Sequence, residues 1–343
     1  MQEKERRKVQ LTGKSSCMVA LPKKWVREMG LRQGSEILIT RPSLTSLLIS
    51  ADPVEVPKAR REAIIEVSDK DSAEGLFRKI VSLYIQGYSL IGLRTVSGSL
   101  STLKRDNVKE MVRRHLIGTE GVSDSKDRMS IHVLLGYSEL SAENALKKML
   151  VIATSMQKDA LMALDNHDKV VAQGVIERDD EVDRFGLYVS RQLNVSIRQG
   201  VYKEALLEPQ DMLGITLVVR MLERIADHSS RICEQILKLD APLRKPTVAK
   251  LIPLGEFDLN MVDSAMLALF KRDHLGADLL FERKKQFFEM AKSVRESLDL
   301  KQIPEEAYPV QVILESLGRI VEYAGDIAEV VLNLTIERVV KQD

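Results

Sequence analysis

Apolar residues recur with a helical period along the second half of the chain, from Ser141 onward. Three successive segments each carry one such face, marked by Ala145, Leu146, Met149, Ile152, Ala153 and Met156; by Val175, Asp179, Val182, Gly186, Val189 and Leu193; and by Val218, Leu222, Ile225, Ser229, Ile232 and Ile236. Spacings of three and four residues place these side chains on one side of a helix, and such helices pack around a shared core. We therefore predict a three-helix bundle at residues 141–240.

A second helical region follows a stretch that is rich in helix breakers. Pro242, Pro246, Pro253 and Gly255 predict a break, and Pro304 and Pro309 predict a later interruption. The second region repeats the first, because Ala163, Asp168, Ala172, Glu177 and Arg178 recur at a constant offset as Ala268, Asp273, Ala277, Glu282 and Arg283. At a slightly smaller offset, Arg224, Ile225 and Glu234 correspond to Arg319, Ile320 and Glu329. Residues 256–343 are therefore predicted to form a second bundle in tandem.

The part of the chain before the bundles alternates between shorter elements. From Lys8 to Ser50 the pattern predicts two strands, a short helix from Lys23 to Met29 that Gly30 ends, and two more strands. Residues 62–136 follow the order β-α-β-α-β-β, which predicts a small α/β sandwich domain at 58–138. Because about fifty residues rarely bury enough surface to fold alone, the β-rich domain at 1–52 is expected to dimerise.

Charge is unevenly distributed over this multidomain chain. Residues 1–50 carry ten Lys or Arg and four acids, 10 − 4 = +6, and the net charge of +1 leaves +1 − 6 = −5 for the remainder. A basic head on an acidic body suggests that the head binds a polyanion. No apolar run approaches the roughly 18 residues that span a bilayer, so we expect a cytoplasmic protein without membrane insertion. Cys17 and Cys233 are expected to be reduced and buried.

The segment from Arg7 to Ile39, RKVQLTGKSSCMVALPKKWVREMGLRQGSEILI, resembles the SpoVT/AbrB swapped-hairpin family. The resemblance rests on a Lys-Val strand, a Gly turn, a Leu-Pro-Lys-Lys helix start and a second Gly turn before a strand. It implies an interleaved homodimer that lays basic residues on DNA phosphates, here Arg6, Arg7, Lys8, Lys14, Lys23 and Lys24. The alternative is that these cations form a solvated face on a domain that only dimerises.

The helical half resembles PhoU. The matching segments are IERDDEVDRF from Ile176 to Phe185, MLERIADHSSRICEQILKL from Met221 to Leu239 and SLGRIVEYAGDIAEVVLNL from Ser316 to Leu334. The resemblance implies two bundles in tandem, negative regulation of phosphate uptake and phosphate homeostasis, and acidic i, i+4 pairs that bind metal ions.

Only the first bundle keeps the acidic pattern that the PhoU resemblance implies. Asp179 and Asp183 on one helix, with Glu223 and Asp227 on another, are the candidate ligands for a divalent metal or iron. In the second bundle their counterparts are Lys284, Phe288, Gly318 and Glu322. The competing interpretation is that Arg178, Arg184, Arg224 and Arg231 neutralise these acids as surface ion pairs.

No catalytic motif accompanies these features, and the protein is predicted not to be an enzyme. A di-iron site needs Glu-x-x-His on two helices, and none of the five histidines has Glu three residues before it. His228, next to Asp227, remains a candidate to assist a metal. Two functions stay open: a phosphate-responsive transcription regulator that binds promoter DNA, or an adaptor that only dimerises through its hairpin domain and binds a phosphate-transporter ATPase or signalling kinase.

Overall fold

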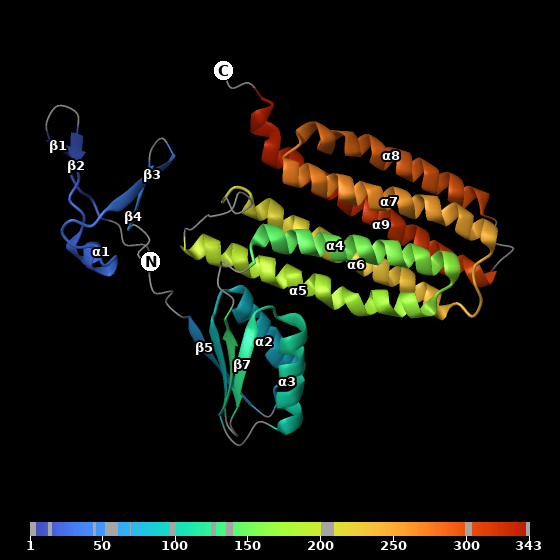
Figure 1. The fold of residues 1–343 in the computed structure, drawn as a ribbon, viewed down its shortest axis with the longest axis horizontal. Coiled ribbons are helices and arrows are strands. Elements are labelled where there is room, and N and C mark those ends of the chain that lie inside the picture. The colour runs from blue at the N-terminus through green and yellow to red at the C-terminus, as the bar shows by residue number, and fades with distance from the viewer. Residues whose placement is uncertain are drawn as a thin grey trace. The chain divides into compact units, whose positions relative to one another are not determined.

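The computed structural model describes residues 5–12, 16–43, 46–51, 61–68, 70–96, 101–124, 128–134, 140–199, 209–298 and 304–340. The chain divides into two compact units, Met1–Arg60 and Arg61–Asp343. The first unit holds the β-rich hairpins, and the second holds an α/β domain and the long helices (Figure 1).

The first unit consists of two hairpins and a short helix. β1 (Gln10–Thr12) pairs antiparallel with β2 (Ser16–Met18), α1 spans Lys23–Glu28, and β3 (Ile37–Ser43) pairs antiparallel with β4 (Ser46–Ala51). Gly30, two residues after α1, has a left-handed φ of 68°, as a glycine that ends a helix requires. The predicted order of strand, strand, helix, strand, strand is confirmed.

This first unit exposes its apolar side chains. Val9, Leu11 and Ile39 are 64%, 83% and 55% exposed, and Pro22 alone is buried among its described side chains. Cys17 is also exposed, so the expectation that it is buried was wrong. A single copy of so short a segment has no second layer to cover its hairpins, which explains why these residues lie at the surface.

The α/β domain follows the predicted element order. β5 (Glu62–Val67), α2 (Ala73–Ile85), β6 (Leu90–Thr95), α3 (Thr102–His115), β7 (Thr119–Asp124) and β8 (Arg128–Val133) form a sheet with strand order β5-β6-β8-β7. β5 and β6 are parallel, and the other two pairs are antiparallel.

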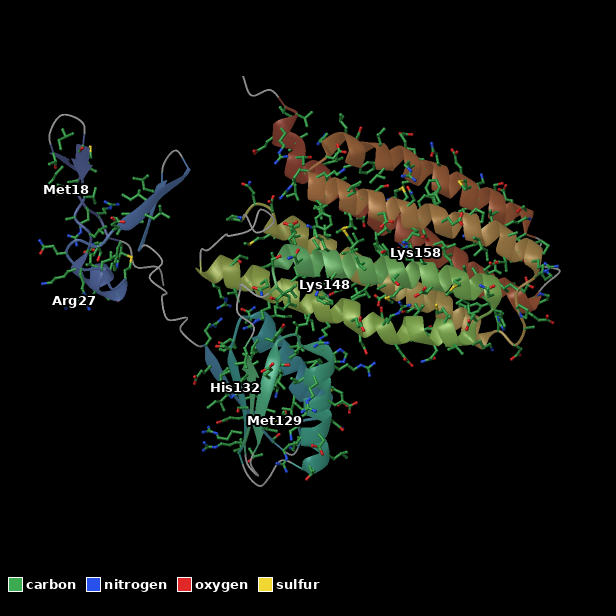
Figure 2. The ribbon with its side chains drawn as sticks, viewed as in Figure 1. Met18, Arg27, Met129, His132, Lys148 and Lys158 are labelled. Carbon is green, nitrogen blue, oxygen red and sulfur yellow. The ribbon has the colours of Figure 1, made fainter. Side chains whose placement is uncertain are left out.

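One face of this sheet carries the core of the α/β domain. Alternate residues of β8, including Met129, are buried together with residues of α2 and α3, whereas His132 belongs to the opposite set (Figure 2). The alternation follows from the period of two in a strand that is covered on one side.

The second unit continues as long helices that share one core. They are α4 (Ala142–Asn166), α5 (Lys169–Gln199), α6 (Met212–Lys238), α7 (Lys245–Lys271), α8 (His274–Ser297) and α9 (Pro304–Thr335), with a 3₁₀ turn, η3, at Ile336–Arg338. α4, α5 and α6 make the first bundle, and α7, α8 and α9 the second. α4 contacts α7 and α6 contacts α9, so a single hydrophobic core runs through both bundles (Figure 1).

The internal repeat is visible in matched contacts. Arg178 of α5 donates to Ser155 Oγ at 3.2 Å and pairs with Asp159, both on α4. The corresponding Arg283 of α8 donates to Ser264 Oγ at 3.3 Å and to Asn260 Oδ1 at 2.7 Å, both on α7.

The turns that precede α5 and α8 also match. His167 and Arg272, at equivalent positions, both adopt left-handed φ angles of 52° and 53°. The tandem arrangement inferred from the sequence therefore extends to individual side chains and to the backbone.

The predicted break at Pro253 and Gly255 is wrong, because α7 runs continuously through both residues. Pro246 lies in the first turn of α7, where proline is tolerated. A Cβ at Gly255 would collide with the Leu161 side chain of α4, so the glycine permits close helix packing. The expected interruption at Pro309 is also absent, since α9 includes it.

Candidate acidic site on the first bundle

The four predicted acidic residues lie on one face of the first bundle. Asp179 and Asp183 come from α5, Glu223 and Asp227 come from α6, and the two helices are in extensive contact. Gly186 of α5 leaves the space into which the Glu223 carboxylate folds, because a Cβ there would collide with Glu223 Oε1. The i, i+4 spacing and one glycine therefore suffice to gather these acids.

The charged forms of these four carboxyl groups are disfavoured by desolvation and, for three of them, by repulsion from neighbouring acids. Burial, followed by the charges of Asp227 and Asp183, raises the pKa of Asp179 to about 7. Burial also raises the pKa of Asp183 and of Glu223, and in both cases neighbouring acids of the same face add to the shift. Partial desolvation raises the pKa of Asp227 as well, although Asp227, like Asp183, remains exposed. Such a face is stabilised by protons or by a cation that reduces the repulsion.

Arginines compensate this face only in part. Arg220 donates to Glu223 Oε2 at 2.8 Å, and Arg224 lowers the pKa of Asp227. Of the other arginines predicted to neutralise the acids, Arg178 binds α4 as described, and Arg231 pairs with Glu315 of α9 at 3.7 Å. The ion-pair interpretation therefore accounts for part of the charge.

The α/β domain supplies further basic side chains that the sequence did not reveal. Arg114, in the last turn of α3, forms an ion pair with Asp180 of α5, and His115 Nδ1 lies 3.9 Å from Asp180 Oδ1. His115 also lowers the pKa of Asp183. Only the tertiary contact between α3 and α5 brings these groups together, and no spacing rule predicts it.

His228 does not join the acidic face. Its ring lies 5.8 Å from the ring of Tyr323 on α9, and burial, with Arg231 nearby, lowers its pKa to about 4. The imidazole is therefore neutral at pH 7 and packs between the bundles. The idea that it assists a metal is not supported by its placement.

The acidic face is not a closed metal site. In the part of the chain that the structure describes, no three His, Cys, Asp or Glu side chains are grouped closely enough to hold a metal ion. The donor set is nevertheless all carboxylate, which suits hard cations. Metal binding by Asp179, Asp183, Glu223 and Asp227 stays a prediction.

The predicted DNA-contacting residues are distributed over the first unit. Arg6, Arg7, Lys8, Lys23 and Lys24 are exposed, and Lys14 lies outside the described residues. Arg7 pairs with Glu5 at 2.8 Å, and Lys24 lies 4.0 Å from Glu28. Surface pairs of this kind are weak, so they leave the cations accessible to a polyanion.

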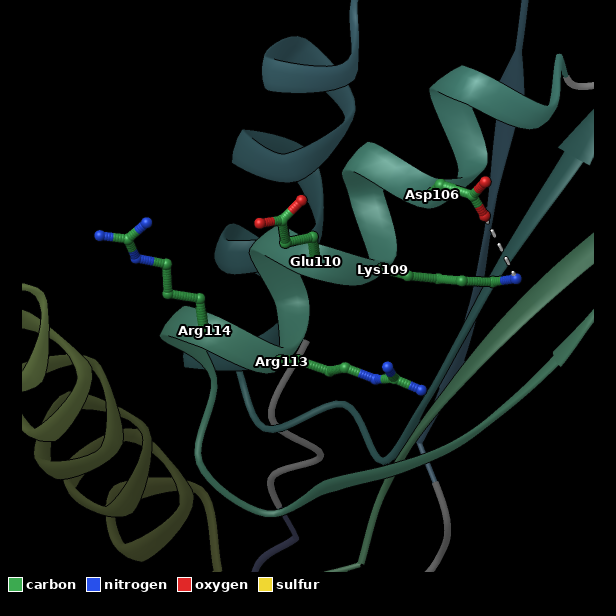
Figure 3. A pocket seen from close by; sticks show the side chains of 5 residues that line it. All are labelled: Asp106, Lys109, Glu110, Arg113 and Arg114. Atoms are coloured by element: carbon green, nitrogen blue, oxygen red, sulfur yellow. Dashed lines mark ion pairs between the residues drawn. The ribbon is translucent and has the colours of Figure 1, made fainter.

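A shallow surface pocket of about 520 Å³ lies on α3. Figure 3 shows Lys109 and Arg113 extending from the same side of the helix, with Lys109 paired to Asp106 at 3.9 Å. Glu110 and Arg114 complete the lining. Because acids and bases alternate here, the pocket has no dominant charge that would select a ligand.

The fold is an all-α tandem bundle joined to a small α/β domain. Residues 146–236 match the PhoU domain family. No curated protein sequence matches significantly. Among the described residues, no helix is long and apolar enough to cross a membrane.

Two solved structures share the fold of the helical region. PhoU from Pseudomonas aeruginosa is 24% identical, with a TM-score of 0.52 over 57% of this chain and 96% of that chain. The phosphate transport system regulatory protein PhoU from Streptococcus pneumoniae is 19% identical, with a TM-score of 0.50 over 59% of this chain and 96% of that chain. The bundles thus correspond to nearly the whole of each relative, and the residues beyond them are additional.

Proposed function

We propose that this protein is a phosphate-responsive regulator of phosphate transport that binds rather than catalyses. The observation that carries the proposal is the PhoU domain match at residues 146–236, together with a tandem-bundle fold that covers 96% of each solved PhoU chain. The bundles offer broad helical faces to protein partners, and the first bears an acidic face in which burial and neighbouring acids raise the pKa of Asp179 to about 7.

The first unit is proposed to form a homodimer of the SpoVT/AbrB type. Its exposed Leu11, Ile39 and Leu47 would be covered by a second copy whose hairpins interleave with its own. The same unit carries the exposed cations Arg6, Arg7, Lys8, Lys23 and Lys24. Dimerisation would present two sets of cations to the phosphate backbone of a promoter.

The test of DNA binding is a titration of the full chain into promoter DNA of phosphate-transport genes at two salt concentrations. Reversal of three cations, in R6E/R7E/K8E, is expected to abolish binding, because acids in their place repel the DNA phosphates; any binding that remains should depend less on salt, by about one unit of slope for each lost phosphate contact. A matched control reverses three exposed lysines of the bundles, K158E/K238E/K292E, and should bind as the native chain does. Equal binding by the R6E/R7E/K8E protein would remove the DNA half of the proposal.

An adaptor role is the second candidate. The exposed apolar side chains of the first unit require a partner copy but not DNA, and this favours a domain that only dimerises. In that case the R6E/R7E/K8E protein would still capture a phosphate-transporter ATPase or a signalling kinase. Neither this variant nor the native chain would bind the promoter.

The acidic face is proposed to bind a divalent metal or iron through Asp179, Asp183, Glu223 and Asp227. Binding to the native state alone raises the melting temperature. We expect Mn²⁺ to raise the melting temperature of the native chain by a few degrees, and to have no effect on D183N/D227N. The control E181Q changes an exposed acid on the same helix and should respond as the native chain does. An equal response of D183N/D227N would place the cation elsewhere.

A further inference from the structure

The second bundle differs from the first at the positions equivalent to the acidic face. Lys284 of α8 takes the place of Asp179, and Gly325 of α9 takes the place of Ser230. Lys284 and Gly325, the two residues that differ, lie next to each other in the structure. A Cβ at Gly325 would lie 3.0 Å from Lys284 Cδ and 3.2 Å from its Nζ, so the lysine lies along α9 in the space that the glycine leaves open.

The charge of this lysine acts on an acid of α9. Burial raises the pKa of Asp326, next to Gly325; the charge of Lys284 lowers it, and the charges of Glu329 and Glu322 raise it. Glu322 is partly committed to Arg319, which donates to its Oε2 at 2.7 Å. The positive charge of Lys284 therefore opposes the repulsion that Glu329 and Glu322 exert on Asp326, a repulsion like that among the acids of the first bundle.

Apolar residues replace two of the acids on the remainder of the equivalent face, where Phe288 is 38% exposed. Phe288 replaces Asp183, and Gly318 replaces Glu223. The Phe288 ring packs over Gly318, since a Cβ at Gly318 would lie 3.6 Å from it, and its edge meets Phe287 at 5.5 Å between ring centroids. Phe287 is fully buried. Two of the four carboxylates of the first bundle therefore have no polar counterpart in the second.

We propose that the ammonium group of Lys284 supplies the positive charge that a bound metal ion would supply in the first bundle. The second bundle therefore does not respond to added cations, whereas the first does. The contrast with the first bundle rests on the proposed function. The assignment of Lys284 itself rests on the contacts of the second bundle alone.

The test uses thermal unfolding of the full chain at low salt, with and without Mn²⁺, in the D183N/D227N background that silences the first bundle. K284M keeps the aliphatic stem beside Gly325 and removes only the charge. We expect the background protein to be indifferent to Mn²⁺. With K284M added, the melting temperature should fall by a few degrees at low salt and be restored by Mn²⁺.

K285M is the matched control, because Lys285 is exposed and pairs with Glu282 at 2.7 Å on its own helix. K285M should not change the melting temperature of the background protein, and Mn²⁺ should still have no effect on that temperature. The proposal is overturned if the background protein already gains stability from Mn²⁺, or if K284M neither lowers the melting temperature nor creates a response. Failure of the first bundle to bind Mn²⁺ affects neither result, because both are read in its absence.

Discussion

Asp258 is the most deeply buried acid of the described residues, with 1% of its surface exposed. It lies on α7, and Gln157 Nε2 of α4 donates to its Oδ1 at 3.2 Å across the boundary between the bundles. Asp258 Oδ2 and Gln157 Oε1 have no hydrogen-bond partner. A protonated Asp258 would supply the missing donor between these two atoms, and burial raises its pKa well above the usual value.

The raised pKa makes stability depend on pH. The native state holds a proton that the unfolded state releases above about pH 4, so the free energy of unfolding falls as pH rises, by up to about 1.4 kcal/mol per unit until the native pKa is passed. In D258N the amide can donate to Gln157 without a titrating proton. We expect D258N to lose this slope and to exceed the native chain in stability increasingly as pH rises above about 4, measured by urea unfolding.

The control is D263N, which changes an exposed acid on the same helix and should keep the native slope. Parallel pH profiles for D258N and the native chain would show that Asp258 is ionised in the folded state.

At the scale of elements, the sequence predicted those helices and strands whose buried residues recur with a regular period. The helices of the bundles follow from faces such as Leu222, Ile225 and Ile236, all buried here, and the strands from alternation in the α/β domain. The continuous α7 was not predictable, because Gly255 serves a contact with Leu161 of another helix. A helix breaker and a packing glycine look alike until the neighbouring helix is in place.

In the acidic face too, the features set by spacing along one helix were predictable, whereas those set by contacts between distant segments were not. Its four residues were predictable because i, i+4 spacing puts each pair on one helix face. The basic side chains opposite Asp180 were not predictable, since Arg114 and His115 reach it only through the docking of α3 on α5. The role of Lys284 was visible only as a substitution until the structure placed it against Gly325.

At the scale of the second unit, α5 belongs to two cores at once. Leu187 packs against the core of the α/β domain, while Val182 and Val189 lie in the core of the bundles. Arg191, 8% exposed, donates from Nη1 to the carbonyl oxygens of Tyr84 at 2.5 Å and Tyr88 at 2.8 Å. The α/β domain is thus tied to the helix that carries Asp179 and Asp183.

R191M is expected to weaken this attachment. It removes the donor of the Tyr88 carbonyl oxygen, at a cost on the order of 1–3 kcal/mol if that oxygen stays buried, whereas the Tyr84 oxygen keeps the backbone N–H of Gly87 at 3.0 Å. Because the methionine cannot replace those bonds, the α/β domain should unfold at lower urea than the bundles, as a separate first transition. R198M is the control, since Arg198 is exposed and donates to the side chain of Gln86, so its loss should cost less than about 0.5 kcal/mol.

The attachment also has a consequence for the acidic face. If the α/β domain separates in R191M, Asp180 loses Arg114, and the acids of α5 lose a neighbouring positive charge. A cation should then bind the first bundle more tightly, so Mn²⁺ should raise the melting temperature of the bundle transition more in R191M than in R198M. An identical Mn²⁺ response in the two variants would mean that the α/β domain and the acidic face act independently.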